Sequence, residues 1–541
     1  KYHKSAQTYN PIRNSDGTIL YAPQKEEKPF GFEEVNAKTR RIYLEFALNY
    51  SRQIKDHSFT AMLLYNQSKL HDPTLAYAIP NGVQGLVGRV TYDYKKRYLA
   101  EFNAGYNGTE NFAKGKRFGF FPAYSLGWVA SEEAFFPKNK TVSFLRIRGS
   151  YGEVGNDKVG GTRFLYNPSS YVYQNNTHYF GKPGSTFQPY QGSSEGVIGN
   201  PSLTWERARK ANIGADIHFW DNKIRFTGDY FYETRNNILA TPQTTPEITG
   251  VTFPAQNLGK MKNYGFELDL AYENNIREFN YWAQGNFTYA TNRILFQDEV
   301  NRVYPYSYRT GQRYGQYFGY IAEGFYNTWE EVNDANRPVS IENSNKIMPG
   351  DIKFKDINGD GIINADDMVP IGYSDFPEII YGVSFGGEFK GFDFSVLFQG
   401  ATNVSRYTYI TSVRPFENDQ MAQAYIPKMS WTYEKYLNGD EIKLPHLSAQ
   451  QVQKHNYQSS TFIVQDASYL RLKNVEIGYT FEHSILKKIR ASSLRLYING
   501  NNLITWHGLY PGEDPEQVSR GGDWAPYPNT RVINFGFNIK F

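Results

Sequence analysis

A two-residue period dominates the chain from residue 41 to its end. In "RIYLEFALNY", the apolar residues Ile42, Leu44, Phe46, Leu48 and Tyr50 alternate with mostly more polar neighbours. The segments "YLAEFNAGYNG", "YGFELDLAYE" and "RVINFGFNIKF" repeat the pattern, and about fifteen such segments can be counted along the chain. Alternation over eight or more residues places apolar and polar side chains on opposite faces of a β-strand. The sequence therefore predicts an all-β protein.

The connections between these segments alternate in length. The short ones are "IKDHSF", "DYKKRY", "FWDNKI", "ENNIRE" and "EFKGFD". The long ones are rich in Gly, Asn, Tyr and Pro and cover, approximately, 152–204, 239–262, 296–377, 402–466 and 507–530. Short turns at one end and long loops at the other are typical of an antiparallel up-and-down meander.

Strand length distinguishes a membrane barrel from a soluble sandwich. Sandwich strands are usually about five or six residues long, whereas most of these segments run about nine to twelve, close to the 9–11 residues that a tilted strand needs to cross a bilayer. Aromatic residues gather near segment ends, as at Phe219–Trp220 and Tyr479–Phe481, in the manner of an interfacial girdle. The pattern favours a transmembrane antiparallel β-barrel, and a soluble sandwich is the alternative.

Composition and motifs exclude several classes of function. The chain has no Cys, which excludes disulfides, thiolate metal sites and Cys nucleophiles. The net charge of +4 and the lack of a basic stripe do not favour a nucleic-acid partner. The H-E-x-x-H and G-x-S-x-G motifs are absent, as is a Gly-rich loop between a strand and a helix. We therefore expect no enzymatic activity.

Some polar and aromatic residues have simple interpretations. His218 alternates with Asp216 on the polar face of one segment, which favours lumen lining over a metal pair. Glu132 and Glu133 lie at a turn and are expected to be solvated. Aromatic side chains in loops could offer stacking platforms to a glycan, but loop packing is the more common role of such residues. They are Trp329, Trp431 and Trp524. No substrate-binding residue is assigned.

The stretch "DINGDGIINADD", residues 356–367, has the spacing of an EF-hand-type calcium loop. Oxygen-bearing side chains occupy positions one, three and five, a Gly follows where the loop must turn, and a carboxylate stands at position twelve. We predict a structural Ca²⁺ bound by Asp356, Asn358, Asp360, the Ile362 carbonyl, Asp367 and, through water, Asn364. The alternative is an Asp/Asn/Gly turn that holds no metal.

The block "GDIKFKDINGDGIINADDMVPIGYSDFPEIIYGVSFGGEFKGFDFSVLFQG", residues 350–400, resembles SusC-like TonB-dependent outer-membrane transporters. The segments "DASYLRLKNVEIGYTF", "LRLYINGNNLITW" and "NFGFNIKF" extend the resemblance. It implies a plugged barrel in the outer membrane of a Gram-negative bacterium. Such a barrel imports oligosaccharides or oligopeptides, is driven by the TonB complex, and is covered by a SusD-like lipoprotein. The alternatives are a soluble or surface calcium-stabilised glycan-binding β protein, or an adhesin.

The resemblance also predicts how the chain is organised. Transporters of this kind have about 22 strands around a plugged lumen. Counting back from Phe541 over the roughly fifteen alternating segments makes "RIYLEFALNY" about the eighth strand of such a barrel. Residues 1–40 are expected to form an extracellular loop segment that leads into the barrel. Residues 41–541 are expected to form its C-terminal part, with the calcium loop within 350–377. The plug, the TonB-binding segment and the first seven or so strands would then lie on a separate N-terminal segment, because bare sheet edges in lipid cost tens of kcal/mol.

Overall fold

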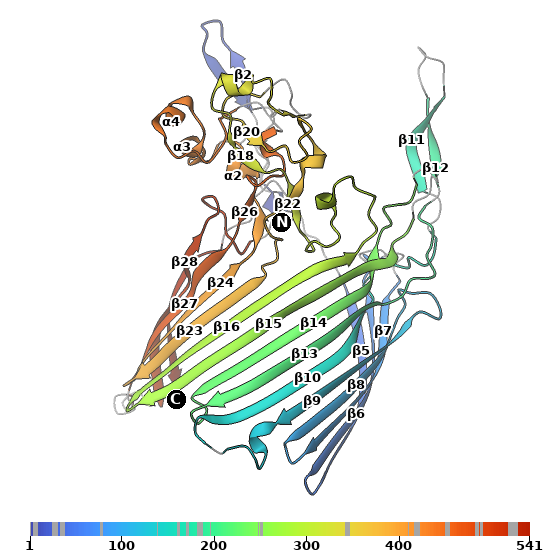
Figure 1. Cartoon of the computed structure of the whole chain (residues 1–541), viewed down its shortest axis with the longest axis vertical. Helices are drawn as coiled ribbons and strands as arrows, with labels where there is room; N and C mark the ends of the chain where they lie inside the picture. The colour runs from blue at the N-terminus through green and yellow to red at the C-terminus, as the bar shows by residue number, and fades with distance from the viewer. Residues whose placement is uncertain are drawn as a thin grey trace.

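The computed structural model is dominated by β-strands (Figure 1). It describes residues 2–3, 9–23, 31–32, 38–75, 79–137, 139–158, 163–168, 172–180, 188–194, 196–246, 248, 253–340, 347–408, 410–415, 422–448, 455–481, 486, 491–517 and 529–541. No helix within these residues is both long and apolar enough to cross a membrane.

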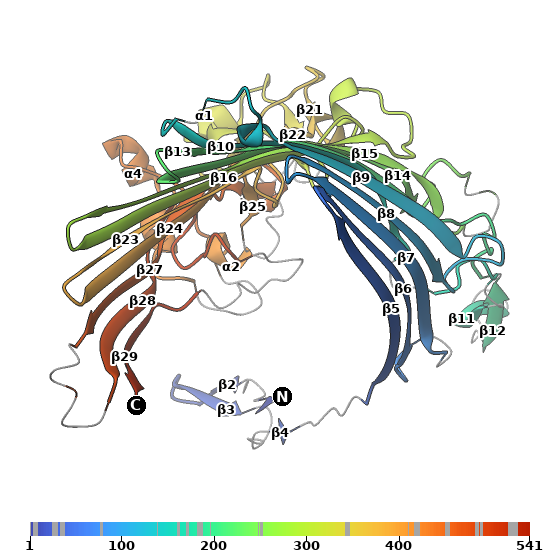
Figure 2. The same cartoon turned by 90° about the horizontal axis from the view of Figure 1, so that it is seen from below.

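A single antiparallel sheet of 15 strands forms the body of the protein. Apart from short strands in the loops, its strands pair in sequence order, which confirms the predicted meander. They are β5 (Arg40–Ile54), β6 (His57–His71), β7 (Asn81–Tyr94), β8 (Tyr98–Thr109), β9 (Phe118–Val129), β10 (Val142–Asn156), β13 (Glu206–Phe219), β14 (Ile224–Ala240), β15 (Gln256–Ile276), β16 (Phe279–Phe296), β23 (Ile379–Phe389), β24 (Phe392–Thr402), β27 (Tyr469–Thr480), β28 (Ser493–His507) and β29 (Val532–Lys540). Figure 2 shows the sheet curving as an open arc.

Tight turns join strands at one end of the sheet and long loops join them at the other, as the segment lengths predict. Only two residues separate β23 from β24, and both adopt positive φ: 46° at Lys390 and 85° at Gly391. Positive φ at both central residues is what a type I′ hairpin turn requires, and glycine adopts it without steric cost. We call the two ends the short-turn end and the long-loop end.

The two faces of the sheet differ in polarity. On one face of β5, Ile42 and Leu44 are exposed, and Phe46 is 69% exposed. Phe535 and Phe537 of β29 are likewise exposed. A soluble sandwich would bury these side chains against a second sheet, but they face outward from a single sheet. The apolar face and the polar face of this sheet therefore match a membrane barrel, and the sandwich alternative is wrong.

Several strands are longer than predicted. β15 has 21 residues and β16 has 18. β15 begins at Gln256, inside the stretch 239–262 that the sequence assigns to a loop, because Leu239 and Ala240 of β14 still pair with Asn257 and Gln256. Such strands exceed the 9–11 residues that cross a bilayer, so they project beyond it at the long-loop end.

Short elements fill the long-loop end. The strands are β11 (Val172–Phe180), β12 (Gln188–Ser194), β17 (Tyr317–Gly319), β18 (Ala322–Phe325), β19 (Val339–Ser340), β20 (Ile352–Phe354), β21 (Ile362–Ile363), β22 (Val369–Ile371), β25 (Ser405–Tyr407) and β26 (Val464–Asp466). The helices are α1 (Trp329–Val332), α2 (Ile410–Val413), α3 (Ile426–Met429) and α4 (Tyr433–Asn438). Near the N-terminus, β1 (Tyr2–His3) pairs with β4 (Gly31–Phe32). β2 (Tyr9–Arg13) pairs with β3 (Ile19–Pro23) as a hairpin apart from the sheet (Figure 2).

Strands β5 and β29 are the two edges of the sheet, and each pairs with a single neighbour among the described residues. All neighbouring pairs in this sheet are antiparallel, so in a sheet of 15 strands both edges run in the same direction. Joining β5 to β29 directly would make a parallel pair, unlike every other pair in the sheet.

Candidate functional site

Paired charges line the polar face in the half of the sheet near the short-turn end. Arg146 of β10 and Asp216 of β13 lie directly opposite each other, with Nε 2.9 Å from Oδ2. Arg148 reaches the same carboxylate at 3.3 Å and binds Asp229 of β14 with both terminal nitrogens, at 2.6 and 2.5 Å. Thr227 donates to the other oxygen of Asp216 at 3.1 Å. Bidentate arginine–carboxylate pairs fix geometry as well as charge.

Small-ligand sites are typically cavities of about 300 to 1,000 Å³, and one of about 580 Å³ lies beside this network. Its polar lining includes Arg146, Arg148 and Glu101. Glu101 accepts from Arg89 at 2.9 Å and from Asn103 at 2.6 Å. The cavity thus offers both guanidinium and carboxylate groups to a polar molecule.

Charge pairing continues along the polar face. Lys210 of β13 and Arg235 of β14 both bind Glu233, at 3.2 and 3.0 Å. At the other side of the sheet, Arg495 of β28 binds Glu476 at 2.7 Å and Asp393. A face of this kind is stable against water and unfavourable against lipid. In a membrane barrel it lines the lumen.

The long loops fold into a cap with its own small cores. We call the described residues within 297–378 and 403–468 the loop cap. Tyr320 donates its amide hydrogen to the Ser459 carbonyl and accepts from the Thr461 amide, each at 2.9 Å. One buried cluster consists of Tyr320, Ile352, Phe354 and Ile363, and another of Val413, Ile426, Leu444 and Ile463 together with Tyr510 of the loop after β28. The cap therefore joins two segments that are separated in sequence by β23 and β24.

Asp351 is the buried polar centre of the loop cap and is only 2% exposed. Its carboxylate accepts from Asn456 Nδ2 at 2.7 Å and from the Met348 amide at 2.9 Å, and lies 3.0 Å from His446 Nε2. Asn456 in turn accepts from the Ile352 amide at 2.8 Å. A buried carboxylate needs such partners, because leaving it unpaired is costly. No sequence motif marks this network, since its members are about a hundred residues apart.

A second buried ion pair fixes the loop that follows β28. Arg471 of β27 is 1% exposed and binds Asp514 at 2.7 Å and Glu516 at 3.2 Å. Burial acts to raise the pKa of Asp514, but backbone donors at Glu516 and Asn529 together with the Arg471 guanidinium lower that pKa below its usual value. Asp514 is therefore ionised at neutral pH and compensates the buried arginine.

The predicted calcium loop is closed by hydrogen bonds to its own carboxylates. Asp356 accepts from the amides of Gly359 and Gly361 at 2.7 and 2.8 Å. Asp360 accepts from the Ile362 amide at 2.7 Å. Gly359 and Gly361 have φ of 76° and 80°, which explains why glycine stands at both positions. These residues form a compact turn.

Asp367 closes the other end of the loop and is fully buried. It accepts from the Ile357 amide at 2.8 Å and from the Asn364 amide at 2.9 Å. Asn358 Nδ2 lies 3.2 Å from the hydroxyl of Tyr304. The loop is therefore packed against the preceding part of the loop cap.

The donor set of this loop is chemically suited to Ca²⁺, because every predicted ligand atom is an oxygen. A carboxylate has about four acceptor positions, so one that accepts two amides can still coordinate a cation. Within the part of the chain that the structure describes, however, no three His, Asp or Glu side chains gather closely enough to hold a metal ion. The structure thus places the predicted ligands in one turn without assembling their carboxylates around a single point.

Three other sequence interpretations can be compared with the structure. His218 lies 2.7 Å from Asn222 Oδ1, whereas Asp216 binds arginines. Of the two glutamates expected to be solvated, Glu132 is exposed, whereas Glu133 is only partly exposed. Its side chain is 12% exposed and accepts from Tyr98 at 2.5 Å and Trp128 at 3.1 Å, because the turn folds back onto the aromatic ends of β8 and β9.

The two loop tryptophans that the structure describes, Trp329 and Trp431, lie in different environments. Trp431 packs inside the loop cap and donates to Asn327 Oδ1 at 3.0 Å. Trp329 is exposed at the start of α1. Trp524 lies outside the described residues.

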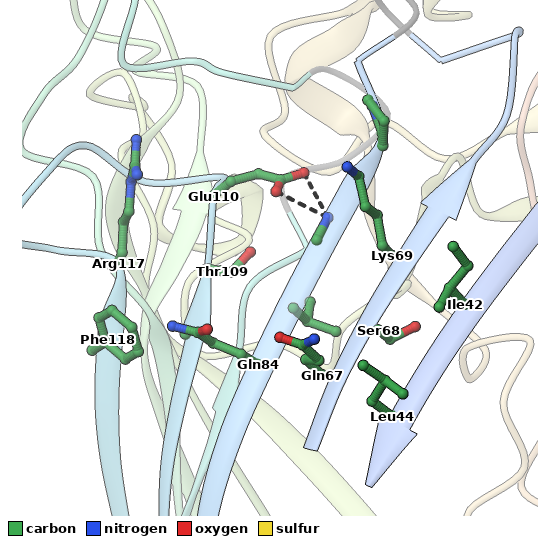
Figure 3. A pocket seen from close by; sticks show the side chains of 14 residues that line it. Ile42, Leu44, Gln67, Ser68, Lys69, Gln84, Thr109, Glu110, Arg117 and Phe118 are labelled. Carbon is green, nitrogen blue, oxygen red and sulfur yellow. Dashed lines mark hydrogen bonds between the residues drawn. The ribbon is translucent and has the colours of Figure 1, made fainter. Parts of the chain in front are cut away.

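A further cavity, of about 400 Å³, lies at the long-loop ends of β5 to β9. Figure 3 shows Ile42, Leu44 and Phe118 among its lining side chains, with Glu110 accepting from the Gly82 amide at 2.9 Å. Ile42 and Leu44 belong to the apolar face. This cavity therefore opens away from the lumen and is not part of a path through it.

An exposed apolar face, a charge-paired polar face and long loops at one end define an outer-membrane β-barrel of the receptor and transporter class. The chain belongs to the TonB dependent receptor-like, beta-barrel family, whose model matches residues 5–350. The barrel lies in the outer membrane of a Gram-negative bacterium, with the long-loop end outside the cell. The family consists of receptors rather than enzymes, which agrees with the predicted lack of catalysis.

Curated relatives support the SusC-like assignment. TonB-dependent receptor P3 of Formosa agariphila is 28% identical over 483 residues, covering 84% of this chain and 45% of the relative. TonB-dependent receptor SusC of Bacteroides thetaiotaomicron is 28% identical over 500 residues, covering 88% of this chain and 45% of the relative. The chain thus spans about half the length of the curated relatives it matches.

A solved structure described as the RagAB peptide transporter has the same fold. It matches with a TM-score of 0.70 at 21% identity, covering 93% of this chain and 56% of the matched chain. At that identity the likeness concerns the fold.

Proposed function

We propose that this chain forms the C-terminal barrel wall of a TonB-dependent importer of oligosaccharides or oligopeptides. The observation that carries the proposal is the charge-paired polar face with its cavity of about 580 Å³. Such a wall suits the passage of a polar polymer fragment, since amides, carboxylates and guanidinium groups replace the hydrogen bonds that the fragment loses with water. Its membership of the receptor family supports energy-coupled uptake.

Further strands from the rest of the importer would close this sheet into a barrel. Because β5 and β29 run in the same direction, an odd number of further strands is needed to close an antiparallel barrel. We assign these strands, the plug and the TonB-binding segment to an N-terminal segment of the same transporter. A SusD-like surface lipoprotein would cover the loop cap, as the relationship to SusC suggests.

Uptake assays in cells that carry the full-length transporter test this function. Labelled oligosaccharide and oligopeptide mixtures are expected to enter the periplasm only when TonB is present, while surface binding survives its deletion. Native mass spectrometry of the purified assembly should then show a plug-containing polypeptide, the lipoprotein and a bound ligand. Surface binding with no TonB-dependent uptake would favour the adhesin alternative instead.

We also propose that the turn at residues 356–367 binds a structural Ca²⁺. The ligands would be Asp356, Asn358, Asp360, the Ile362 carbonyl, Asp367 and, through water, Asn364. The all-oxygen donor set and the two glycines with positive φ support this proposal. The ion would stabilise a loop of roughly eighty residues between β16 and β23, since ordering a long loop has a large entropic cost.

Chelation measures this contribution. In intact cells, EDTA is expected to increase proteolysis within residues 296–377 about tenfold, and added Ca²⁺ should reverse the effect. The double variant Asp356→Ala/Asp360→Ala should be sensitive without chelator. Asp334→Asn, in an exposed turn of the same loop, is the matched control. Equal proteolysis with and without EDTA would identify a metal-free turn.

A further inference from the structure

A row of polar residues that includes three cations crosses the apolar face at the long-loop ends of neighbouring strands. Register places Glu153 of β10 opposite Arg209 of β13, and Arg209 opposite Thr234 of β14. Thr234 lies opposite Lys262 of β15, and Lys262 opposite Arg293 of β16. Residues opposite each other on adjacent strands share one face of the sheet. The five residues therefore form one continuous row.

This row borders the lipid-facing surface. The next row toward the membrane on the same face consists of Tyr151, Ala211, Tyr232, Tyr264 and Thr291. The Tyr232 and Tyr264 rings stack at 6.4 Å, and Lys262 Nζ lies 5.4 Å from the centre of the Tyr264 ring. Tyrosines at strand ends mark the membrane–water interface. The cations stand immediately above it.

The row has a surplus of positive charge. Arg207, on the same face of β13, binds Glu153 at 2.8 Å, and Arg209 binds it at 2.9 Å. Neither Lys262 nor Arg293 has an ion-pair partner among the described residues. Arg207 lies one row nearer the long-loop end; with it included, four cations and one carboxylate leave a surplus of three positive charges. Of the cations, Arg209 is exposed, and Arg207, Lys262 and Arg293 are half-buried.

The tilt of the strands spreads these cations over some depth. The strands lean across Figure 1, so a row perpendicular to them climbs toward the extracellular side from β13 to β16. With a spacing of about 4.8 Å and a tilt of about 40°, Arg293 lies about 9 Å above Arg209. That span exceeds the size of one phosphate group. It suits a headgroup with several phosphates on an extended scaffold.

We propose that this basic row binds an outer-leaflet glycolipid that carries more than one phosphate. Its acyl chains would lie against the tyrosine row and the apolar residues below, such as Ile213 and Phe266. Its phosphates would contact Arg209, Lys262 and Arg293. Anionic headgroups are attracted to cations at the membrane surface, and arginine binds phosphate through two parallel hydrogen bonds. The interaction does not depend on what the lumen transports.

Binding can be measured on the full-length transporter in phosphatidylcholine nanodiscs. The probes are bisphosphorylated lipid A, monophosphoryl lipid A and phosphatidylglycerol, counted per protein by native mass spectrometry. Bisphosphorylated lipid A is expected to bind most tightly. Each cation contributes about fivefold at a membrane surface, so Arg209→Gln/Lys262→Gln/Arg293→Gln should weaken its binding about 100-fold. Lys55→Gln/Lys96→Gln/Lys223→Gln, which removes three exposed cations at the short-turn end, should leave binding unchanged.

Several results would overturn the proposal. One is equal binding of bisphosphorylated lipid A by the wild type and the first triple variant. Another is equal binding of bisphosphorylated lipid A and phosphatidylglycerol by the wild type. A third is displacement of bound lipid A by free inorganic pyrophosphate as effectively as by free bisphosphorylated lipid A. If that variant does not fold, the wild type alone provides the test. Raising the salt from 50 to 500 mM should weaken its binding of bisphosphorylated lipid A at least tenfold, and salt-independent binding would contradict an electrostatic site.

Discussion

Refolded alone into lipid vesicles, residues 1–541 are expected to yield no protease-protected barrel and no heat-modifiable band on a gel. The reason is the pair of open edges at β5 and β29. About ten backbone groups on each edge would face lipid without partners, at several kcal/mol apiece. The total, tens of kcal/mol, exceeds the whole stability of an ordinary domain.

Parity makes this prediction stringent. The two edges run in the same direction, so the chain cannot close on itself by an antiparallel pair. The full-length transporter, refolded under the same conditions, is the control and should give the heat-modifiable form. Adding the N-terminal segment proposed above to residues 1–541 should restore it in part. A closed, protease-resistant species from residues 1–541 alone would show that β5 and β29 can pair in parallel.

Replacing Asp351 with Ala is expected to unfold the loop cap while leaving the barrel intact. The substitution removes the acceptor for Asn456 and for the Met348 amide, and the neighbour of His446. Breaking a buried, hydrogen-bonded pair costs about 3–5 kcal/mol. Burial also lowers the pKa of the adjacent His455, so that ring stays neutral and cannot replace the lost charge interaction.

Hydrogen exchange in the full-length transporter gives a local measurement of this effect. The Ile352 amide, bonded to Asn456 Oδ1 at 2.8 Å, should exchange at least 100-fold faster in Asp351→Ala. Amides of β14 and β15 should be unchanged. Asp334→Ala, in an exposed turn of the same loop, is the matched control. Unchanged exchange at Ile352 would mean that the cap is held by its apolar clusters alone.

Much of the barrel could be predicted from the sequence because its determinants are local. Alternation in "RIYLEFALNY" predicts both the strand β5 and its apolar face. Short stretches such as "EFKGFD" predict the tight turns, since only a few residues separate two alternating segments there. The strand count followed from the same period, and so did the family resemblance in the block 350–400.

The contacts within the loop cap, the environment of Glu133 and the start of β15 could not be predicted in this way. Asp351 meets Asn456 across about a hundred residues, and nothing in either local sequence specifies the other. A turn residue such as Glu133 is expected to be solvated, but tertiary contacts with Tyr98 and Trp128 cover part of its side chain. β15 extends past its predicted start because pairing with β14 outweighs the Gly and Asn residues of that stretch.

The same reasoning applies to the basic row. Arg209, Lys262 and Arg293 are separated by 53 and 31 positions along the chain, and only the register brings them together. The calcium loop is the opposite case. Its spacing is contained within twelve residues, so the Ca²⁺ site could be proposed from the local sequence alone, and the chelation experiment tests it.

The division of the loop cap between two stretches of chain has a kinetic consequence. Hairpin β23–β24 lies between the two stretches in sequence, so contacts such as Tyr320 with Ser459 and Thr461 require both stretches to be on the same side of the membrane. The loop cap can therefore fold only after this hairpin has been inserted into the membrane. Protease resistance of the loop cap would then appear late in biogenesis and would report that the barrel strands beneath it have already been inserted.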